Sequence, residues 1–320
     1  MICRKRESFL FKNDRIFLAG HNGLVGSSIL RYLKNKKYTK ILTVDKNKLD
    51  LTNQQNTEKY LKKIKPDFVI IAAAKVGGIN ANQSFKAEFI YNNIMIQTNL
   101  IYASYKVGVK KLIFLGSSCV YPKFCKQPIK EKYLLSGKLE PTNDAYAIAK
   151  IAGLKMCEAY NSQYKMNYIC LMPTNLYGPN DNYNLKNSHF FPALISKIYN
   201  GKINNKKFLK IWGNGLAKRE LMYVDDLSEA CEFFLKKKTR HTLINIGSGD
   251  ERTITDYAKF ICKKLGIKLR FNYDHKMPTG TPRKKLDLKL SKSYGWKSKI
   301  SLSKGFDNTF KDFLNRHSKI

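Results

Sequence analysis

The chain has 320 residues and a formal net charge of +35, from 59 lysines and arginines against 24 aspartates and glutamates. Hydrophobic residues make up 43% and aromatic residues 12%, which excludes a disordered polycation and predicts one large or two modest folded domains. Only ten of the basic residues are arginine, the type suited to reading bases and phosphates, so we interpret most of the surplus as solvated surface lysine.

The first twelve residues carry charges but no apolar stretch of the signal-peptide kind, and we assign them no role. The longest apolar run, 68–74, is too short to span a bilayer. Seven cysteines lack paired spacing and five histidines lack a metal-ligand pattern. We therefore predict a cytoplasmic protein with reduced thiols, no metal and no membrane partner.

Apolar strands alternate with helical patterns through the first half of the chain. Strands are predicted at 15–19, 41–44, 68–72, 111–115 and 168–172, and helices at 24–33, around 60–64, at 90–107 and at 144–160. This rhythm predicts an α/β fold, a Rossmann-type doubly wound parallel sheet. Beyond residue 173 it changes, so we predict a dinucleotide-binding domain at 13–172, joined again by part of 219–250, and a smaller C-terminal α/β substrate-binding domain at 173–320.

A glycine-rich loop follows the first strand: Gly20-His-Asn-Gly23-Leu-Val-Gly26. In a dinucleotide-binding turn the first glycine permits the tight turn, the second lets the backbone approach a pyrophosphate, and the third lets helix and strand pack closely. The alternative is an ordinary strand-to-helix turn, and the position between a strand and a helix favours the dinucleotide site.

The second strand leads to Asp45, where an acid usually binds the ribose 2′-hydroxyl of NAD, and the next residue, Lys46, offers a partner for a 2′-phosphate. These residues leave NAD and NADP both open.

Tyr146 and Lys150 form a YxxxK pair within a helical stretch, so they share a helix face. A nearby ammonium favours the phenolate, so we expect the lysine to lower the tyrosine pKa and make Tyr146 a proton donor to a carbonyl. Ser117, which follows a strand, is placed to hold the same carbonyl oxygen. Tyr91, Tyr102 and Phe114 are expected in the core.

This order of motifs resembles the short-chain dehydrogenase/reductase superfamily, and the length resembles its extended branch. More specific strings resemble the GDP-L-fucose synthase family over nearly the whole chain. These strings are Ala72-Ala-Ala-Lys-Val-Gly-Gly-Ile79, Gly116-Ser-Ser-Cys-Val-Tyr-Pro-Lys123, Glu140-Pro-Thr-Asn143, Met172-Pro-Thr-Asn-Leu-Tyr-Gly-Pro179, Asn187-Ser-His189, Trp212-Gly-Asn-Gly, Arg219-Glu and Gly280-Thr-Pro-Arg-Lys284.

The resemblance implies conversion of GDP-4-keto-6-deoxy-D-mannose to GDP-L-fucose, by 3,5-epimerisation and then NADPH-dependent reduction at C4. It implies Cys119 and His189 as the acid–base pair for epimerisation, with Ser117, Tyr146 and Lys150 completing the catalytic set. Thiol and imidazole both exchange protons near neutrality, which suits that role. The other six cysteines are expected to be structural.

The same resemblance implies binding residues. NADP(H) is favoured over NAD(H), although relatives commonly carry an arginine where this loop has Asn22. The residues implied for the cofactor are Gly20, His21, Asn22, Gly23, Leu24, Val25, Gly26, Asp45, Lys46, Ser117, Lys150, Pro173, Thr174, Asn175, Leu176 and His189. For the GDP-sugar they are Lys197, Trp212, Arg219 and Arg283, the arginines suiting a diphosphate.

Two alternatives accompany this interpretation. One is a nucleotide-sugar 4-epimerase or 4,6-dehydratase of the same fold, although Ser117-Ser-Cys119 lacks the acidic pair that a dehydratase needs. The other is a non-enzymatic basic protein that binds nucleic acid on a dinucleotide scaffold. We favour the enzyme, with a small-molecule partner, no nucleic-acid partner, and a homodimer that the resemblance implies through two long helices.

Overall fold

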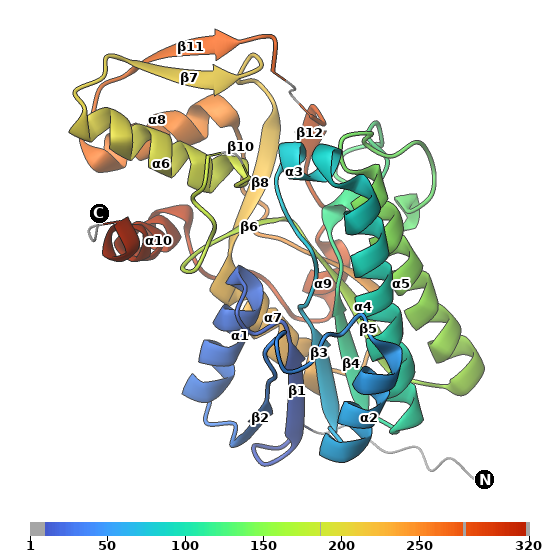
Figure 1. The fold of residues 1–320 in the computed structure, drawn as a ribbon. Coiled ribbons are helices and arrows are strands. Elements are labelled where there is room, and N and C mark those ends of the chain that lie inside the picture. Colours follow the sequence, from blue (N-terminus) through green and yellow to red (C-terminus); the bar gives the residue numbers. More distant parts are fainter. Residues whose placement is uncertain (1–9, 186, 278–279, 318–320) are drawn as a thin grey trace.

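The computed structural model describes residues 10–185, 187–277 and 280–317 (Figure 1). A six-stranded sheet has the order β2-β1-β3-β4-β5-β9, and every neighbouring pair is parallel. The doubly wound parallel sheet predicted from the sequence is therefore confirmed. Its strands are β1 (Arg15–Ala19), β2 (Lys40–Leu42), β3 (Phe68–Ile71), β4 (Lys111–Leu115), β5 (Tyr168–Pro173) and β9 (Leu243–Ile246).

The strands are apolar on both faces because helices cover both faces. Alternate residues face opposite cores: Ile16 and Leu18 pack on one side, Phe17 and Ala19 on the other. The first core includes α1 (Leu24–Asn35) and α7 (Val224–Lys236); the second includes α2 (Gln54–Ile64), α4 (Lys86–Lys106) and α5 (Asp144–Tyr164). Figure 1 shows the two helical layers on either side of the sheet.

The chain changes direction across the sheet at β1. It pairs β1 with β2 on one side and then crosses to β3 on the other. Ligands of open parallel sheets bind outside the carboxyl ends of the strands at such a switch point. The glycine loop after β1 and the Ser117–Cys119 segment after β4 both lie at this edge.

The remaining strands form two smaller sheets. β8 (Lys218–Tyr223) lies between β10 (Glu251–Thr253) and β12 (Arg283–Lys284) and also pairs with β6 (Asn175–Tyr177), while β7 (Phe208–Trp212) pairs with β11 (Arg270–Asp274). A third core is built from β6, β7, β8 and β11 and three helices, α6 (Phe190–Ile203), α8 (Ile254–Leu265) and α10 (Leu302–His317). The shorter helices are α3 (Ile79–Ser84), α9 (Lys289–Ser293), η1 (Ser118–Val120) and η2 (Glu131–Tyr133).

Some local expectations are corrected. Phe114 is fully buried as expected, but Tyr91 is 62% exposed because it lies on the outer side of α4, away from the sheet. Six cysteines are free, and Cys3 lies outside the described residues. Within the described ranges no helix combines the length and apolarity needed to cross a membrane. The domain boundary at 172/173 stays a prediction. Strand β9 joins the six-stranded sheet, and α7 packs on one face of that sheet.

Candidate active site

The glycine loop has the shape of a phosphate cradle. Gly20 has φ +88°, and a Cβ there would lie 2.5 Å from the Ala73 nitrogen. A Cβ on Gly26 would overlap the carbonyl oxygen of Gly20, whereas one on Gly23 would approach nothing closer than 3.9 Å. The outer side of Gly23 is thus open to a ligand at the N-terminus of α1, where backbone N–H groups favour phosphate. The loop fits a dinucleotide.

Asp45 lies against this loop. Asn22 Nδ2 donates to Asp45 Oδ1 over 2.9 Å, and His21 Nε2 is 3.4 Å from the same oxygen. Lys46 next to it is exposed. The structure therefore brings together the loop and the residues that we expect at the adenosine ribose.

The segment after β4 carries Ser117 and Cys119. The Ser117 hydroxyl accepts from the Cys119 backbone N–H over 3.3 Å and caps η1. Lys150, 3% exposed, donates from Nζ to the Leu115 carbonyl over 2.9 Å, and burial lowers its pKa to about 8. The lysine thereby links α5 to the end of β4.

Lys150 Nζ lies 5.8 Å from the centroid of the Tyr146 ring, as the YxxxK spacing predicts. The expected effect on the phenol is wrong, however: the pKa of Tyr146 is raised, chiefly by desolvation and further by the nearby Cys119. Desolvation is the largest cause, and the Lys150 ammonium donates to the Leu115 carbonyl. Tyr146 consequently keeps its proton at neutral pH, as a proton donor must.

Two residues without a predicted role approach the Cys119 sulfur. Asn143 Nδ2 lies 3.3 Å from Sγ, and Lys284 Nζ lies 4.0 Å from it. Lys284 also acts on His189, the residue before α6: desolvation of the imidazole lowers its pKa, and the Lys284 charge lowers it further. Asn143 and Lys284 each end one of the strings that resemble the family. That position was the only signal in the sequence for a role in the site.

The residues expected at the GDP-sugar separate into two groups. Lys197 Nζ lies 5.6 Å from the Trp212 ring centroid, and Arg219, whose pKa is lowered by desolvation, lies near Glu140 and Cys119. Arg283, by contrast, forms a forked ion pair with Glu251, with Nε–Oε1 and Nη2–Oε2 distances of 2.8 Å. Arg283 thus forms an ion pair at the surface and does not point toward Cys119.

The segment after β5 is held by backbone contacts. Thr174 Oγ1 and Asn175 Nδ2 both donate to the Glu220 carbonyl, over 2.9 and 3.1 Å. The Glu220 carboxylate, fully buried, accepts from the Leu286 and Gly249 N–H groups. Glu220, which the sequence analysis quoted only as part of Arg219-Glu and gave no role, therefore ties the cofactor side to the segment that carries Lys284.

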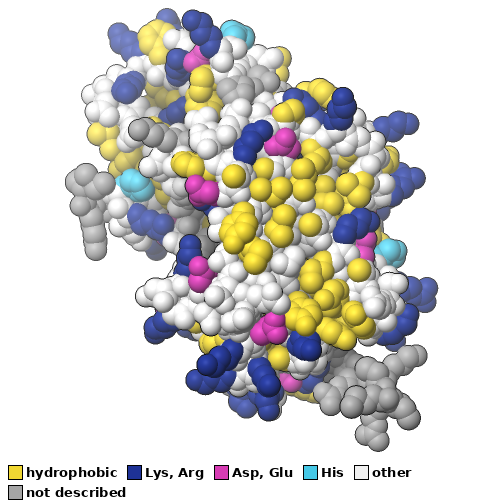
Figure 2. Space-filling model, turned by 45° about the vertical axis from the view of Figure 1, so that its right-hand side comes forward, with side chains coloured by type: hydrophobic (Ala, Val, Ile, Leu, Met, Phe, Trp, Pro, Cys, Tyr) yellow, Lys and Arg dark blue, Asp and Glu magenta, His cyan; other side chains and the backbone are white. Residues whose placement is uncertain are grey.

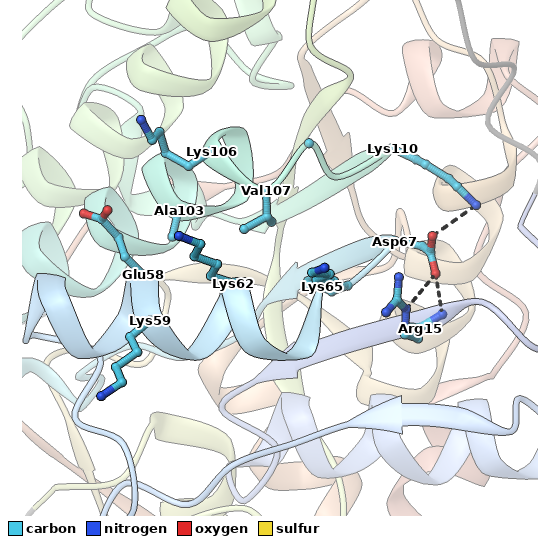
Figure 3. A pocket seen from close by; sticks show the side chains of 12 residues that line it. Arg15, Glu58, Lys59, Lys62, Lys65, Asp67, Ala103, Lys106, Val107 and Lys110 are labelled. Carbon is cyan, nitrogen blue, oxygen red and sulfur yellow. Dashed lines mark hydrogen bonds and ion pairs between the residues drawn. The ribbon is translucent and has the colours of Figure 1, made fainter.

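A basic cavity of about 550 Å³ lies at the opposite edge of the sheet (Figure 3). Arg15 and Lys110 lie around Asp67, with distances of 3.5 and 3.3 Å to its carboxylate. Lys62 and Lys106 occupy the last turns of α2 and α4, where cations complement the helix dipole. Ion pairs and helix ends thus explain why basic residues line this cavity. The candidate catalytic residues lie elsewhere.

Comparisons with known proteins agree with this geometry. A profile of the NAD dependent epimerase/dehydratase family matches residues 16–247. GDP-L-fucose synthase of Sinorhizobium fredii is 48% identical over 307 residues (96% of this chain and 98% of that protein), and that of Escherichia coli is 43% identical over 315 residues (96% and 98%). The NADP-bound GDP-mannoheptose C4 reductase MlghC of Campylobacter jejuni superposes with a TM-score of 0.86 at 34% identity, covering 95% and 99%.

Proposed function

The chain belongs to the NAD dependent epimerase/dehydratase family, and from this membership we propose that it acts as a GDP-L-fucose synthase on GDP-4-keto-6-deoxy-D-mannose. Such an enzyme inverts C3 and C5 and then reduces C4. The observation that carries the proposal is the placement of a thiol, Cys119, within the catalytic group formed by Ser117, Tyr146 and Lys150. A reductase alone has no need of a proton-exchanging thiol there.

The cofactor proposed is NADP(H). The cradle of Gly20, Gly23 and Gly26 would hold the pyrophosphate, and Lys150 with 173–176 would flank the nicotinamide end. When bound, the nicotinamide supplies the hydride for C4. The NADP-bound relative supports the phosphorylated form, and the exposed Lys46 provides a cation for the 2′-phosphate while Asn22 and His21 engage the Asp45 carboxylate.

Epimerisation requires removal of a proton from C3 or C5 on one face of the ring and its return on the other. The 4-keto group acidifies both positions because the resulting charge moves to O4. We assign Ser117 and Tyr146 as the donors to that oxygen, and Cys119 and His189 as the groups that exchange the protons. Both steps and the later reduction place negative charge on the same oxygen, so one set of donors serves all three.

Reduction requires a proton for O4. Tyr146 has a raised pKa, so it holds this proton until the alkoxide forms. Lys150, held by Leu115, fixes the geometry around the phenol. For the GDP group we propose Arg219 at the diphosphate and the Lys197–Trp212 pair beside the base, with Arg283 in an indirect role because Glu251 already occupies its guanidinium.

The test is an assay of the purified protein with GDP-4-keto-6-deoxy-D-mannose and either NADPH or NADH. We expect stoichiometric oxidation of NADPH, a higher kcat/KM for NADPH than for NADH, and GDP-L-fucose as the product. Consumption of neither cofactor would refute the function, and a preference for NADH would refute the cofactor assignment.

A C4 reductase without epimerase activity is the second candidate, favoured by the likeness to MlghC. Such an enzyme would oxidise NADPH but exchange no carbon-bound protons with solvent. A 4-epimerase or dehydratase would recycle its cofactor and show no net oxidation. Nucleic-acid binding would instead give a salt-dependent affinity for RNA or DNA.

A homodimer is proposed through the outer face of α4 and α5. Figure 2 shows hydrophobic side chains gathered on one face of the molecule. Tyr91 on α4, Ile148 and Tyr164 on α5, and Phe85 directly before α4 are exposed apolar side chains of this helix pair. Apolar patches of this kind on a folded surface mark interaction sites, and a two-fold axis buries the same patch on both copies. Tyr91→Glu with Ile148→Glu should give a monomer by light scattering, and a wild-type monomer would contradict the proposal.

The cytoplasm is the proposed location, because the six described cysteines are free.

A further inference from the structure

The loop that follows β6 reaches back to the glycine loop at the start of the chain. Asn180 in this loop donates from Nδ2 to the Asn22 carbonyl over 2.7 Å, and the same nitrogen lies 3.2 Å from the Ser27 hydroxyl in α1. The two contacts join residues 158 and 153 positions apart in the sequence. They are therefore a product of the fold, and none of the roles assigned above uses them.

The peptide bond between Asn22 and Gly23 is held on both sides. Its carbonyl oxygen accepts from Asn180, and its N–H, which belongs to Gly23, donates to the Gly20 carbonyl over 3.4 Å. Because the peptide unit is planar, these two bonds fix its orientation. Gly23 is the residue whose outer side is open to a ligand, so Asn180 acts on the part of the loop that matters for a pyrophosphate.

The Asn180 amide is itself oriented from behind by α10. Its Oδ1 accepts from Arg316 Nη2 over 2.6 Å, so its donor end is the one directed at Asn22. Its backbone N–H donates to Asp312 Oδ2 over 2.9 Å, and Arg316 Nε lies 3.2 Å from that same oxygen. Asn180 has φ +71°, in the left-handed region that asparagine tolerates better than most residues.

The same loop packs on α10 through Tyr183. This tyrosine is buried, its ring centroid lies 4.8 Å from that of Phe313, and its hydroxyl donates to the Thr309 carbonyl over 3.3 Å. Polar and aromatic contacts thus connect the C-terminal helix to the glycine loop through the residues that follow β6.

We propose that Asn180 is a positioning residue for the cofactor: supported by Asp312 and Arg316, it holds the glycine loop in its phosphate-binding shape before NADP(H) arrives. This inference rests on the proposed function for the identity of the cofactor. A loop that is ordered in advance binds more tightly, because binding then immobilises fewer groups. Helix α10 thereby contributes to cofactor affinity, although it carries none of the residues assigned to the cofactor.

The test compares variants by calorimetric titration with NADPH and by amide hydrogen exchange of the cofactor-free full chain. Asn180→Gly removes the side chain but keeps a residue that adopts positive φ without strain. It should raise the Kd for NADPH about tenfold, as expected from two lost hydrogen bonds, and speed exchange at 20–28. Asn205→Gly is the matched control, because Asn205 after α6 is also left-handed, with φ +49°. It should leave both readouts within twofold of wild type.

A double-mutant cycle tests the link to α10. Arg316→Met alone should raise the Kd for NADPH several-fold. In the Asn180→Gly background it should have little further effect, because Arg316 acts through the amide that Asn180→Gly removes.

A Kd for NADPH within twofold of wild type in Asn180→Gly would overturn the proposal, and so would additive effects in the cycle. Exchange that rises equally along the whole chain would also overturn it, because the role would then be one of general stability. If the wild type does not bind NADPH, the proposed cofactor fails. Faster exchange confined to 20–28 would then still support the positioning role, and unchanged exchange there would overturn it.

Discussion

At the scale of single residues, the site depends on groups whose protonation is set by burial. Tyr146 and Lys150 are shifted in opposite directions, each toward its neutral form, because desolvation penalises charge. In the proposed reduction, the pair therefore starts with the proton on the phenol. The YxxxK spacing predicted that Tyr146 and Lys150 would lie together. It did not predict their protonation states, since the Leu115 carbonyl that accepts from Lys150 is 35 residues away in the chain.

Tyr146→Phe removes the proton donor to O4 and should lower NADPH oxidation by about 10²- to 10⁴-fold, the usual contribution of a general acid. Cofactor affinity, measured by fluorescence titration, should change little. Tyr102→Phe on α4 is the control. Turnover within twofold of wild type would mean that another group supplies the proton.

Lys111 in β4 offers a test of burial outside the site. It is fully buried, its Nζ donates to the Lys237 carbonyl, and burial lowers its pKa to about 7. The unfolded chain then binds more protons than the folded chain between about pH 7 and 10.5, so the cost of this lysine is full below pH 7 and shrinks as pH rises. Lys111→Met should raise the free energy of unfolding by about 1–3 kcal/mol at pH 7.

The gain should be smaller at pH 9.5 than at pH 6 in urea denaturation. An equal gain at both pH values would show that packing rather than charge is responsible. Lys110→Met, which removes a cation paired with Asp14 and Asp67, should instead lower stability.

At the scale of elements, the parallel strands and their helices followed from local pattern. The strand at 111–115 matches β4, and the helix expected at 24–33 ends two residues later, at Asn35. Helix α4 starts four residues earlier than expected. Its N-cap is Phe85, so no polar capping residue marks this start in the sequence. These differences come from capping, which periodicity does not reveal.

Arg283 and Lys284 show why part of the site could not be predicted. Both lie in one short strand, and neighbouring strand residues point to opposite faces. Only the pairing of β12 with β8 decides which one reaches Cys119, and that pairing joins residues more than 60 positions apart. The sequence assigned Arg283 to the diphosphate, which stays a prediction; in the structure Arg283 pairs with Glu251, and Lys284 approaches the Cys119 sulfur.

The role of the glycine loop in cofactor binding is tested by a substitution at Gly26. Gly26→Ala places a methyl group against the Gly20 carbonyl and should separate α1 from the loop, weakening NADPH binding by tenfold or more. Gly201→Ala in α6 is the control, because its Cβ would make only an ordinary 3.5 Å contact with Leu269. Unchanged NADPH affinity in Gly26→Ala, measured by calorimetry, would show that the loop does not bind the pyrophosphate.

At the scale of the whole molecule, the charge of +35 has few assigned tasks. Lys150, Arg219 and Lys284 are assigned to the candidate site, and Lys62, Lys106 and Lys110 of the basic cavity complement helix ends and carboxylates. The remaining cations still produce a positive field that attracts a GDP-sugar.

Raising the ionic strength from about 20 to about 200 mM should therefore lower kcat/KM several-fold, because screening shortens the reach of the field. The value of kcat should change less than twofold, since the chemistry occurs after capture. A kcat/KM that does not respond to salt would show that the surface charge has no part in binding.

We propose that one group of residues at the carboxyl edge of the sheet performs both epimerisation and reduction. It is tested most directly by turnover of GDP-4-keto-6-deoxy-D-mannose with NADPH in deuterium oxide, with the product analysed by NMR. We predict GDP-L-fucose with deuterium at C3 and C5, and one NADPH oxidised per product. A reduced product without deuterium at both carbons, or deuterium exchange without oxidation of NADPH, would contradict the account.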